Sequence, residues 1–542
     1  MSKFTEPPVK GKLKWNDELP CADFPAAAEI VDVVVYEGRA GDLALTITSL
    51  MAVVNSEKPR IAIAEDGRTD PFDTLGIKFK LFKDPYELFE KYKEYMAKAV
   101  IWDKACEHTA NLASTFAGLE DAIVVTAEDY DILKKAGIEL DIIADYRGMF
   151  DSKLAVYNYM YDKYYPRCTR KLITSVPPGT STLRDYSMAV KSAIIFLEFK
   201  DEEGKLADKF FSKCESGNSA VLGWAPDGDE KGIVTCASLN GLYVWASDHS
   251  LSMSYFAANR GVTPKLPLKS VDQYVGKDGK VKPFVYVAIA ISDGDNLQYM
   301  QRDMFDWFNN RLHRHKKMPA LSWTINPAAC DIIPVIYNYF VSPKQLKKYP
   351  DDGYLTGPSG IGYYYPYKMF GSKKQDDLLK FVEQTNRYCK KTGINTVSVW
   401  FEAVQDPEIP EDFMKAVAPK LSDVSAMLFQ RRMNSKAVDS VAFWGWNDPY
   451  NDNPVVNFQK EIKMAVDTIA ENPNKAEYVS LQAVPWDTKM LKHFLQVRKY
   501  ADNLNSGKVK GKDIIKYVTV DQLVQLQRIE IGLPRTNAED YT

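Results

Sequence analysis

Asp293 and Asp295 are the residues whose types and spacing point most directly to chemistry. They stand in the segment ISDGDN, directly after the apolar run FVYVAIAIS at 284–292. Side chains two positions apart in extended backbone project the same way, and Gly294 between them permits a bend. Two neighbouring carboxylates resist ionising together, so one tends to keep a proton. Such a pair can act as acid and base in the hydrolysis of a glycosidic bond.

Two other interpretations of this pair stay open. One aspartate could cap the next helix at its amino terminus, with Asn296 close by. The Asp-x-Asp spacing also suits two oxygen ligands for a hard metal cation.

Polar and aromatic residues follow several other predicted strands. Active sites of β/α barrels lie at the carboxyl ends of the strands, so these residues are candidates for binding substrate. They are Trp323 and Asn326 in WTINP, Glu402 in WFE, Trp446 and Asn447 in WGWNDPY, and Trp486 in QAVPW. Aromatic rings with polar tips suit partly polar ligands such as sugars. Glu402 could equally be a solvated loop residue.

The stretch GPSGIGYYYPYKMF at 357–370 is too broken for a helix and too aromatic for an ordinary linker. Its glycines allow tight turns, and Pro366 ends the segment. With strand-like alternation, Tyr363 and Tyr365 point one way and Tyr364 the other. We predict that Tyr363 and Tyr365 face the substrate and that Tyr364 packs away from it. Alternatively, all the tyrosines only brace the loop.

The second half of the chain alternates predicted strands with helical patterns. About seven apolar strands are expected, at 284–292, 319–325, 353–357, 396–402, 426–431, 440–446 and 478–484. Strands that are apolar on both faces and joined by helices predict a parallel sheet covered by helices. Seven or eight such units most often close into a TIM-like β/α barrel, and an open doubly wound sheet is the alternative.

The first half repeats a strand–helix–strand pattern. One unit runs from DVVVYEG to RIAIAED and a second from AVIWDKA to AIVVTAED. A third can be read from DIIADYRGMFD to KLITSV, followed by a segment expected to be strand-rich, including GIVTCASLNGLYVWASD at 232–248. The sequence therefore predicts an α/β protein with an N-terminal domain of divergent αβ repeats, 1–280, and a C-terminal barrel, 281–542, joined near GKDGKVKP.

Composition excludes several classes of protein. The 542 residues carry a formal net charge of −3, which argues against binding to nucleic acid or to an anionic membrane. No apolar run is long enough to span a bilayer. The first residues, MSKFTEPPVKGKLKW, lack the apolar core of a signal peptide, so the chain alone predicts a cytoplasmic protein. The seven cysteines form no CxxC pair, and we expect most of them to be free and buried.

Motifs for other chemistries are missing. No GxGxxG opens a helix after the first strand, and no GxSxG marks a nucleophile elbow. Histidines are few, and His313 and His315 stand in a basic segment, RLHRHKK, where solvation is expected. We therefore expect no cofactor and no metal.

The run Gly360-Ile361-Gly362-Tyr363-Tyr364-Tyr365-Pro366 matches the signature GxGYxYP at every position. The chain thus resembles the GxGYxYP family, whose members are regarded as glycoside hydrolases. The layout of αβ repeats followed by a β/α barrel is similar as well, so the resemblance covers nearly the whole chain.

The resemblance implies a site in the cleft between the two domains. Its carboxylates would be an Asp-x-Asp at the first barrel strand, which matches Asp293 and Asp295, and a glutamate from the N-terminal domain. That glutamate falls on Glu230, in GWAPDGDEKGIV, which the sequence alone would assign to a solvated loop. Relatives are often exported, which would make the compartment extracellular or periplasmic if a leader has been removed.

Three hypotheses follow. The first is a glycoside hydrolase acting on a poly- or oligosaccharide, with Glu230 as general acid and with Asp293 and Asp295 positioning and activating water. The second is a carbohydrate-binding protein without catalysis. The third is a metal-assisted hydrolase that uses Asp293 and Asp295 as ligands. The expected partner is a carbohydrate substrate, with no nucleic acid and no membrane span.

Overall fold

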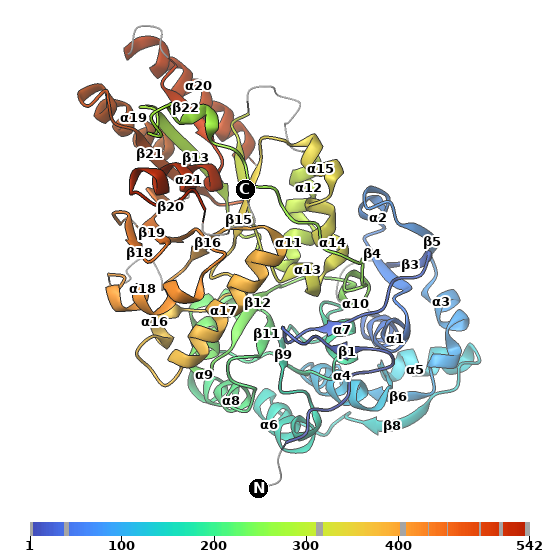
Figure 1. The fold of residues 1–542 in the computed structure, drawn as a ribbon. Coiled ribbons are helices and arrows are strands. Elements are labelled where there is room, and N and C mark those ends of the chain that lie inside the picture. Colours follow the sequence, from blue (N-terminus) through green and yellow to red (C-terminus); the bar gives the residue numbers. More distant parts are fainter. Residues whose placement is uncertain are drawn as a thin grey trace. The chain divides into compact units, whose positions relative to one another are not determined.

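The computed structural model describes residues 4–36, 43–310, 318–401, 408–431, 433–451, 454–486, 489–508 and 513–536. The chain divides into two compact units, whose elements are labelled in Figure 1. The first unit comprises Met1–Val262 with Ala329–Tyr339, and the second comprises Thr263–Ala328 with Phe340–Thr542. Residues 263–283 therefore belong with the second unit.

Three parallel sheets with one shared arrangement form the first unit. Their strand orders are β4-β3-β5, β7-β6-β8 and β10-β9-β11-β12. In each sheet the first strand along the chain lies between the second and the third. The strands are β3 Ile30–Tyr36, β4 Ile61–Glu65, β5 Lys78–Phe82, β6 Lys98–Ile101, β7 Ile123–Val125, β8 Asp141–Asp145, β9 Leu172–Ser175, β10 Ala193–Ile195, β11 Ala220–Gly223 and β12 Tyr243–Ala246. The predicted αβ repeats are thereby confirmed.

Helices join these strands and supply much of the core. They include α1 Ala44–Glu57, α4 Thr109–Glu120, α6 Lys153–Lys163, α7 Arg184–Ala189, α8 Asp201–Phe211 and α9 Glu230–Asn240. Helix α1 is buried almost all round, which requires an apolar sequence on every face. Its Thr48 and Ser49 satisfy their hydroxyls on backbone carbonyls one turn earlier, at Ala44 and Leu45.

Two details of the first unit differ from the prediction. The segment 232–248 was expected to be strand, but helix α9 occupies it as far as Asn240 before β12 begins. Asp229 caps this helix by accepting a hydrogen bond from the Gly232 amide at 2.9 Å, and Gly241 ends it in the left-handed conformation. The third predicted repeat also divides differently, because β8 pairs with β6 of the second sheet and β9 begins the third.

One sheet runs through the second unit in the order β18-β19-β17-β16-β15-β14-β13-β21-β20, with β22 also pairing with β13. All its pairings are parallel except that of β18 with β19. The strands are β13 Val285–Ile291, β14 Leu321–Ile325, β15 Gly353–Thr356, β16 Thr396–Val399, β17 Ala426–Phe429, β18 Lys436–Val438, β19 Val441–Gly445, β20 Asp448–Asn451, β21 Glu477–Ala483 and β22 Ile515–Val518. All seven predicted strands are present, and β18, β20 and β22 were not expected.

The sheet curls so that distant strands face one another. Gln430, directly after β17, donates from Nε2 to Gln482 Oε1 of β21 at 2.5 Å, although these two strands are not neighbours in the sheet. The first strand, β13, lies between β14 and the last strands, β21 and β22, as in a closing barrel. This arrangement confirms a barrel-like sheet and contradicts the open doubly wound alternative.

Helix α21, Val520–Glu530, closes the amino-terminal end of this curled sheet. The Val520 amide donates to Ser322 Oγ at 2.8 Å, and Arg528 donates to the carbonyls of Ser425 and Ser440, where β17 and β19 begin. Its apolar residues share one buried cluster with the inner face of the sheet, including Ala290 and Leu428. The carboxyl-terminal edge of the strands is thus the edge on which a site can open.

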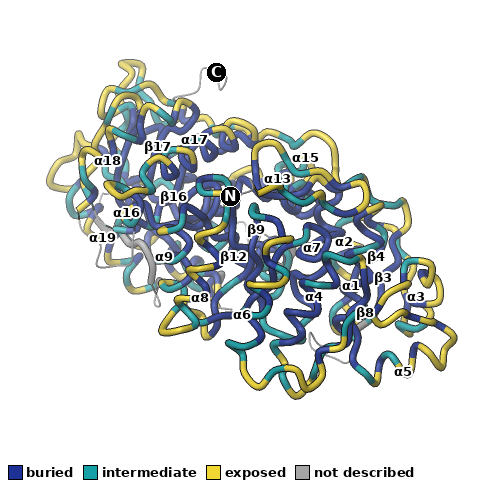
Figure 2. Tube along the Cα trace, turned by 90° about the horizontal axis from the view of Figure 1, so that it is seen from below, coloured by how far each residue is buried: buried dark blue, intermediate teal, exposed yellow. Residues whose placement is uncertain are grey.

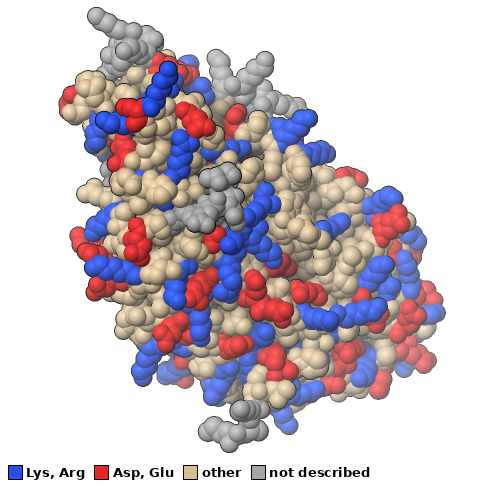
Figure 3. All heavy atoms as spheres, in the orientation of Figure 1, with Lys and Arg blue, Asp and Glu red and all other residues tan. Residues whose placement is uncertain are grey.

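Burial and charge follow the expected pattern. Figure 2 shows strands such as β9, β12, β16 and β17 buried along their length, whereas the residues of β8 are exposed or half-buried. On the face drawn in Figure 3, basic and acidic side chains are intermixed rather than gathered by sign. Among the described residues, no helix combines the length and apolarity needed to cross a membrane. All seven cysteines are free thiols, and burial raises the pKa of Cys168 and Cys214 to about 12, which makes both unreactive.

Candidate functional site

The loop that carries Asp293 and Asp295 is hydrogen-bonded to the end of the neighbouring strand, β14. The Gly294 amide donates to Thr324 Oγ1 at 2.8 Å, and the Asn326 amide donates to the Gly294 carbonyl at 2.9 Å. A Cβ at position 294 would lie 1.6 Å from the Thr324 carbonyl oxygen, so only glycine fits. Asp293 itself takes the left-handed backbone conformation, with φ at 67°, which aspartate tolerates better than most residues.

Asp293 is the more accessible carboxylate of the pair. It is half-buried, and Ser292 Oγ donates to its Oδ2. The indole Nε1 of Trp486 donates to its Oδ1 at 3.2 Å. Hydrogen bonds to both oxygens favour the charged carboxylate. Trp486 is 47% exposed and packs edge-on against Tyr299, with ring centroids 5.4 Å apart, so its ring remains open to a ligand.

Asp295 is buried, with 7% of its surface exposed. A Cβ built on Gly357 would lie 2.4 Å from Asp295 Cβ, so the first glycine of the tyrosine-rich stretch leaves the space that Asp295 fills. Helix α11, Leu297–Gln301, is capped by Asn296, whose Oδ1 accepts from the amides of Gln298 and Tyr299. Neither aspartate is needed as that cap, so both stay available for a site.

The tyrosine-rich stretch, 357–370, packs against helix α17, Gln375–Thr392. Gly360 has φ at 104°, and a Cβ there would lie 2.5 Å from Thr385 side-chain atoms. Tyr364 packs on Phe381 of α17 with centroids 5.2 Å apart, as alternation predicts. Tyr363 points instead toward Trp400, at 6.2 Å, and packs edge-on against Tyr365, at 5.6 Å.

Tyr363 and Tyr365 are themselves buried, with 4% and 1% of their surfaces exposed. Their rings therefore pack within the tyrosine-rich stretch. Of Tyr363, Tyr365 and Trp400, only Trp400 is half-buried. A contact of Tyr363 or Tyr365 with substrate stays a prediction.

Trp323 lies outside the site. It is fully buried in β14, packs edge-on against Phe308 at 5.4 Å, and donates its indole N–H to Asp352 at 2.8 Å. Its ring points toward the helices that cover the sheet, because alternation sends Ser322 and Thr324 to the inner face. This placement leaves no face of Trp323 for a sugar.

The remaining strand-end candidates take different positions. Asn326 is 1% exposed, with its Oδ1 bonded to the Ala328 amide at 2.9 Å. Trp446 is buried on the inner face of the sheet. Asn447 Oδ1 accepts from the Ser480 amide at 2.8 Å, which positions the start of β20. Glu402 lies outside the described residues.

A polar layer that sequence reasoning missed lies inside the curled sheet. Gln430 donates to Gln482 Oε1 and, at 3.4 Å, to Ser398 Oγ. The signal was present in the sequence, since each of these polar residues interrupts or ends an apolar strand at an inward-facing position. Near this layer a hollow of about 390 Å³ is lined by Met433, Asn434, Gly445, Trp446 and Asn447.

Glu230 belongs to the first unit, where it is the first residue of helix α9 and half-buried. It is therefore a helical residue rather than the loop residue that the sequence alone suggests. An acidic side chain in the first turn interacts favourably with the positive end of the helix dipole.

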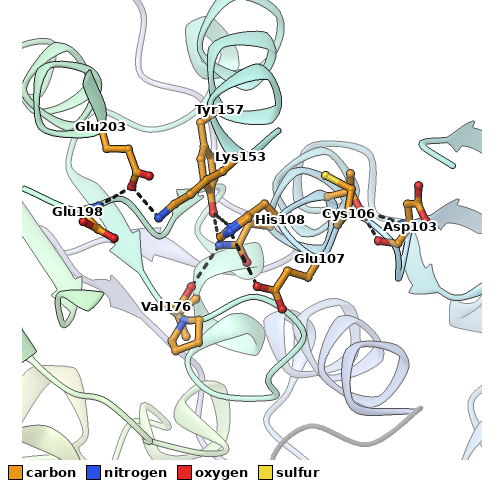
Figure 4. Close-up of polar contacts among 12 residues, drawn as sticks. Asp103, Cys106, Glu107, His108, Lys153, Tyr157, Val176, Glu198 and Glu203 are labelled. Carbon is orange, nitrogen blue, oxygen red and sulfur yellow. Dashed lines mark hydrogen bonds and ion pairs between the residues drawn. The ribbon is translucent and has the colours of Figure 1, made fainter. Parts of the chain in front are cut away.

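A second polar cluster of the first unit is drawn in Figure 4. His108 Nδ1 lies 3.1 Å from the hydroxyl of buried Tyr157, which also accepts from Asn111 at 2.9 Å. Lys153 forms an ion pair with Glu203 at 2.6 Å. Burial first, and then Lys153, lower the pKa of His108. The cluster ties the second and third sheets together, because its members come from α4, α6 and α8.

No group of three or more His, Cys, Asp or Glu side chains within the described ranges is arranged to hold a metal ion. Among these residues, the metal-assisted hypothesis depends on Asp293 and Asp295.

Comparison with known proteins gives a consistent family. Residues 284–528 match the family model described as "GxGYxYP putative glycoside hydrolase C-terminal domain". Residues 96–168 match "GxGYxYP_N second domain", and residues 170–258 match "GxGYxYP third domain". No protein of curated function matches the chain.

Among solved structures, a "putative hydrolase from Bacteroides thetaiotaomicron VPI-5482" has a TM-score of 0.72 at 18% identity, covering 95% of this chain and 97% of that one. At that identity the likeness shows the fold alone. A "novel exo-type maltose-forming amylase" from Pyrococcus sp. ST04 has a TM-score of 0.29 at 12% identity, covering 46% of this chain and 49% of that one. That likeness is too weak to support an argument.

Proposed function

Because the chain belongs to the family described as "GxGYxYP putative glycoside hydrolase", we propose that it cleaves a poly- or oligosaccharide by carboxylate acid/base catalysis at Asp293 and Asp295. The observation that carries this proposal is the hydrogen bond from Trp486 Nε1 to Asp293 Oδ1. It joins an exposed aromatic ring, suited to the C–H face of a sugar, to an accessible carboxylate at a strand end.

Asp293 is the group proposed to activate water. Ser292 and Trp486 both donate to it, so it is held as an acceptor with fixed orientation. A carboxylate in that state can take a proton from water as the water attacks the anomeric carbon. Asp295, buried against Gly357, is proposed to position the same water or the sugar ring.

Glu230 is the proposed general acid, carried over from the family resemblance. Its role would be to protonate the leaving oxygen as the glycosidic bond breaks. Support for this assignment comes from the family layout, and the described geometry adds that the side chain is half-buried at a helix start.

The direct test is incubation of the protein with a panel of plant and host glycans, read by mass spectrometry of released products. New reducing ends that appear with wild-type protein and not with Asp293→Asn support the proposal. Glycan binding without any product over long incubation would favour the carbohydrate-binding alternative. Activity that vanishes with a chelator and returns with added metal would favour the metal-assisted alternative.

A further inference from the structure

We infer that the hollow beside the end of β19 is a further subsite, which binds a second sugar unit of the glycan proposed to be cleaved at Asp293. The inference rests on the proposed function, because it takes the ligand to be a glycan. It assigns Asn434 and Asn447 to hold this second sugar unit. Its basis is the way one extended segment closes the curled sheet.

The extended segment 441–451 changes partners along its length (Figure 1). Its first part, β19, pairs with β17, and its last part, β20, pairs with β21 near the other end of the sheet. Trp446 and Asn447 make the crossing between the two parts. The Trp446 amide donates to the Phe429 carbonyl at 3.2 Å, whereas the Asn447 amide donates to the Ser480 carbonyl at 3.0 Å. The segment therefore joins distant strands of the sheet within two residues.

The hollow lies where this segment leaves β17. Its volume of about 390 Å³ falls within the usual range for ligand pockets, about 300–1,000 Å³. Gly445 brings the segment against the chain that follows β17, because a Cβ there would lie 1.6 Å from the Arg431 carbonyl oxygen. Both chains contribute lining residues, which are Met433, Asn434, Gly445, Trp446 and Asn447.

The hollow and Asp293 belong to the same edge of the sheet. Met433 and Asn434 follow the end of β17, and Gly445 is the last residue of β19. Asp293 follows the end of β13, and the pairings that lead from β13 through β17 to β19 are all parallel. A glycan bound at Asp293 can therefore extend along the carboxyl edge to the hollow.

The side chain of Asn447 is held in one orientation. Its Oδ1 accepts from the Ser480 amide at 2.8 Å and from Ser480 Oγ at 3.0 Å. Both bonds use the oxygen, so Nδ2 is the end of the amide left to donate to a ligand. Asn447 is half-buried and lines the hollow, so part of its surface stays accessible there. A donor that is fixed before the ligand arrives loses little freedom on binding.

Two other lining residues add hydrogen-bond donors. Asn434 is exposed, and its amide can both donate and accept. Trp446 carries a buried indole N–H that has no hydrogen-bond partner among the described residues. Sugar hydroxyl oxygens accept from such donors, and so do the carboxylate oxygens of acidic sugars. The lining therefore fits sugars of both kinds, and both belong in the test.

Protection of Met433 from oxidation measures whether a glycan occupies the hollow. Met433 is half-buried and lines the hollow, whereas Met464, on helix α19, Pro454–Glu471, is 48% exposed and serves as the internal control. Asp293→Asn protein, chosen to slow cleavage, is treated with dilute peroxide in the presence of neutral or acidic oligosaccharides of increasing length. Mass spectrometry gives the rate of sulfoxide formation at each methionine. We expect a bound glycan to slow oxidation of Met433 by about fivefold or more and to leave Met464 unchanged.

Two substitutions test the proposed donors. Asn447→Asp keeps an oxygen for Ser480 but replaces Nδ2 with a second oxygen, and Asn434→Ala removes an exposed amide without adding charge. Loss of one hydrogen bond should weaken glycan binding by about two- to tenfold, measured by calorimetry. Asn472→Asp, at an exposed position after α19, is the control for added charge and should bind as wild type does. If Asn447→Asp does not fold, Asn434→Ala decides.

Protection of Met433, together with weaker binding by at least one of the two variants, would support the inference. A glycan that protects Met433 and is never cleaved would support it and contradict the proposed hydrolysis. A glycan that is cleaved by wild-type protein but leaves Met433 unprotected at every chain length would overturn the inference and leave the proposed hydrolysis standing. Wild-type affinity in both variants would overturn it as well, and so would failure of every glycan to bind at millimolar concentration.

Discussion

The indole nitrogen of Trp486 lies 3.2 Å from Asp293 Oδ1, so an exposed ring and an accessible carboxylate form one unit. The two residues are 193 positions apart in the chain and meet because β21 pairs with β13 along its whole length. In the proposed function, this contact would link a surface that holds the sugar with a group that acts on the glycosidic bond.

Replacing Trp486 should separate these two functions. Trp486→Phe keeps a ring but removes the N–H, and a hydrogen bond to a charged group is worth about 1.5–3 kcal/mol. We expect kcat to fall roughly tenfold or more with KM little changed, whereas Trp486→Ala should raise KM as well. Steady-state kinetics on a cleaved glycan measures both values. Met464→Ala, which removes another exposed apolar side chain, serves as the control. Equal kcat for wild type and Trp486→Phe would show that the contact does not orient Asp293.

Gly357→Ala should damage stability and turnover together. The new Cβ would lie 2.4 Å from Asp295 Cβ, so the aspartate or the loop must move. Overpacking of this kind costs about 1–3 kcal/mol in the free energy of unfolding. Chemical denaturation gives the first effect and kcat the second.

Gly11→Ala is the matched control for this crowding. Its Cβ would lie 2.8 Å from the Ser56 carbonyl oxygen in the first unit, away from any proposed catalytic residue. Because Gly11 also has φ at 55°, in the left-handed region, the alanine should lower stability without changing turnover. Full activity of Gly357→Ala would remove Asp295 from the proposed mechanism.

Glu230→Gln should act on the leaving group if Glu230 is the general acid. Loss of a general acid lowers the rate by about 10²–10⁴-fold on a natural glycan. An aryl glycoside with an acidic phenol needs no such proton, so its cleavage should be nearly unaffected. Rates on both substrates measure the difference, and Asp227→Asn, an exposed carboxylate in the same turn, is the control. Equal losses on both substrates would argue against the acid role.

His108 should make stability depend on pH. Its folded pKa is lowered from 6.5, first by burial and then by Lys153, against opposing effects of Glu107 and Glu203. The unfolded chain therefore binds the proton more readily, so the contribution of His108 is complete above about pH 6.5 and declines as pH falls through the lowered pKa. His108→Gln should flatten the melting temperature between pH 7 and pH 5, measured by calorimetry. An unchanged pH profile would show that His108 does not titrate in this way.

Two local patterns were enough to predict the αβ repeats, the barrel-like sheet and the position of Asp293 and Asp295 at the first strand end. They are the alternation of apolar runs with helical patterns and the turn residues that end each run. The opposite orientations of Tyr363 and Tyr364 also followed from alternation. These features depend on local backbone periodicity, which the sequence carries directly.

The inward or outward direction of a buried strand residue could not be predicted. The strand LSWTI is apolar on both faces, so nothing local told whether Trp323 faced the barrel interior or the covering helices. Register across the sheet decides this, and register depends on partners far along the chain. For the same reason the sequence showed that Ser398, Gln430 and Gln482 interrupt or end apolar strands but not that they meet, because they come together only when the sheet curls.

In helix α9, capping residues that favour a helix outweigh a local preference for strand. The β-branched residues in GIVTCASLN favour a strand, yet Asp229 before them and Gly241 after them are a cap at each end of a helix. The caps and the packing of the buried residues Ile233 and Val234 outweigh the intrinsic preference.

The turnover of Asp293→Asn on a glycan that the wild-type protein cleaves tests the central claim most directly. Asparagine keeps the shape and can still accept from Trp486, so the melting temperature should change little. We predict a fall in kcat of about 10²-fold or more, because the amide cannot take a proton from water. A folded Asp293→Asn protein with wild-type kcat would contradict the assignment of Asp293 as the catalytic carboxylate.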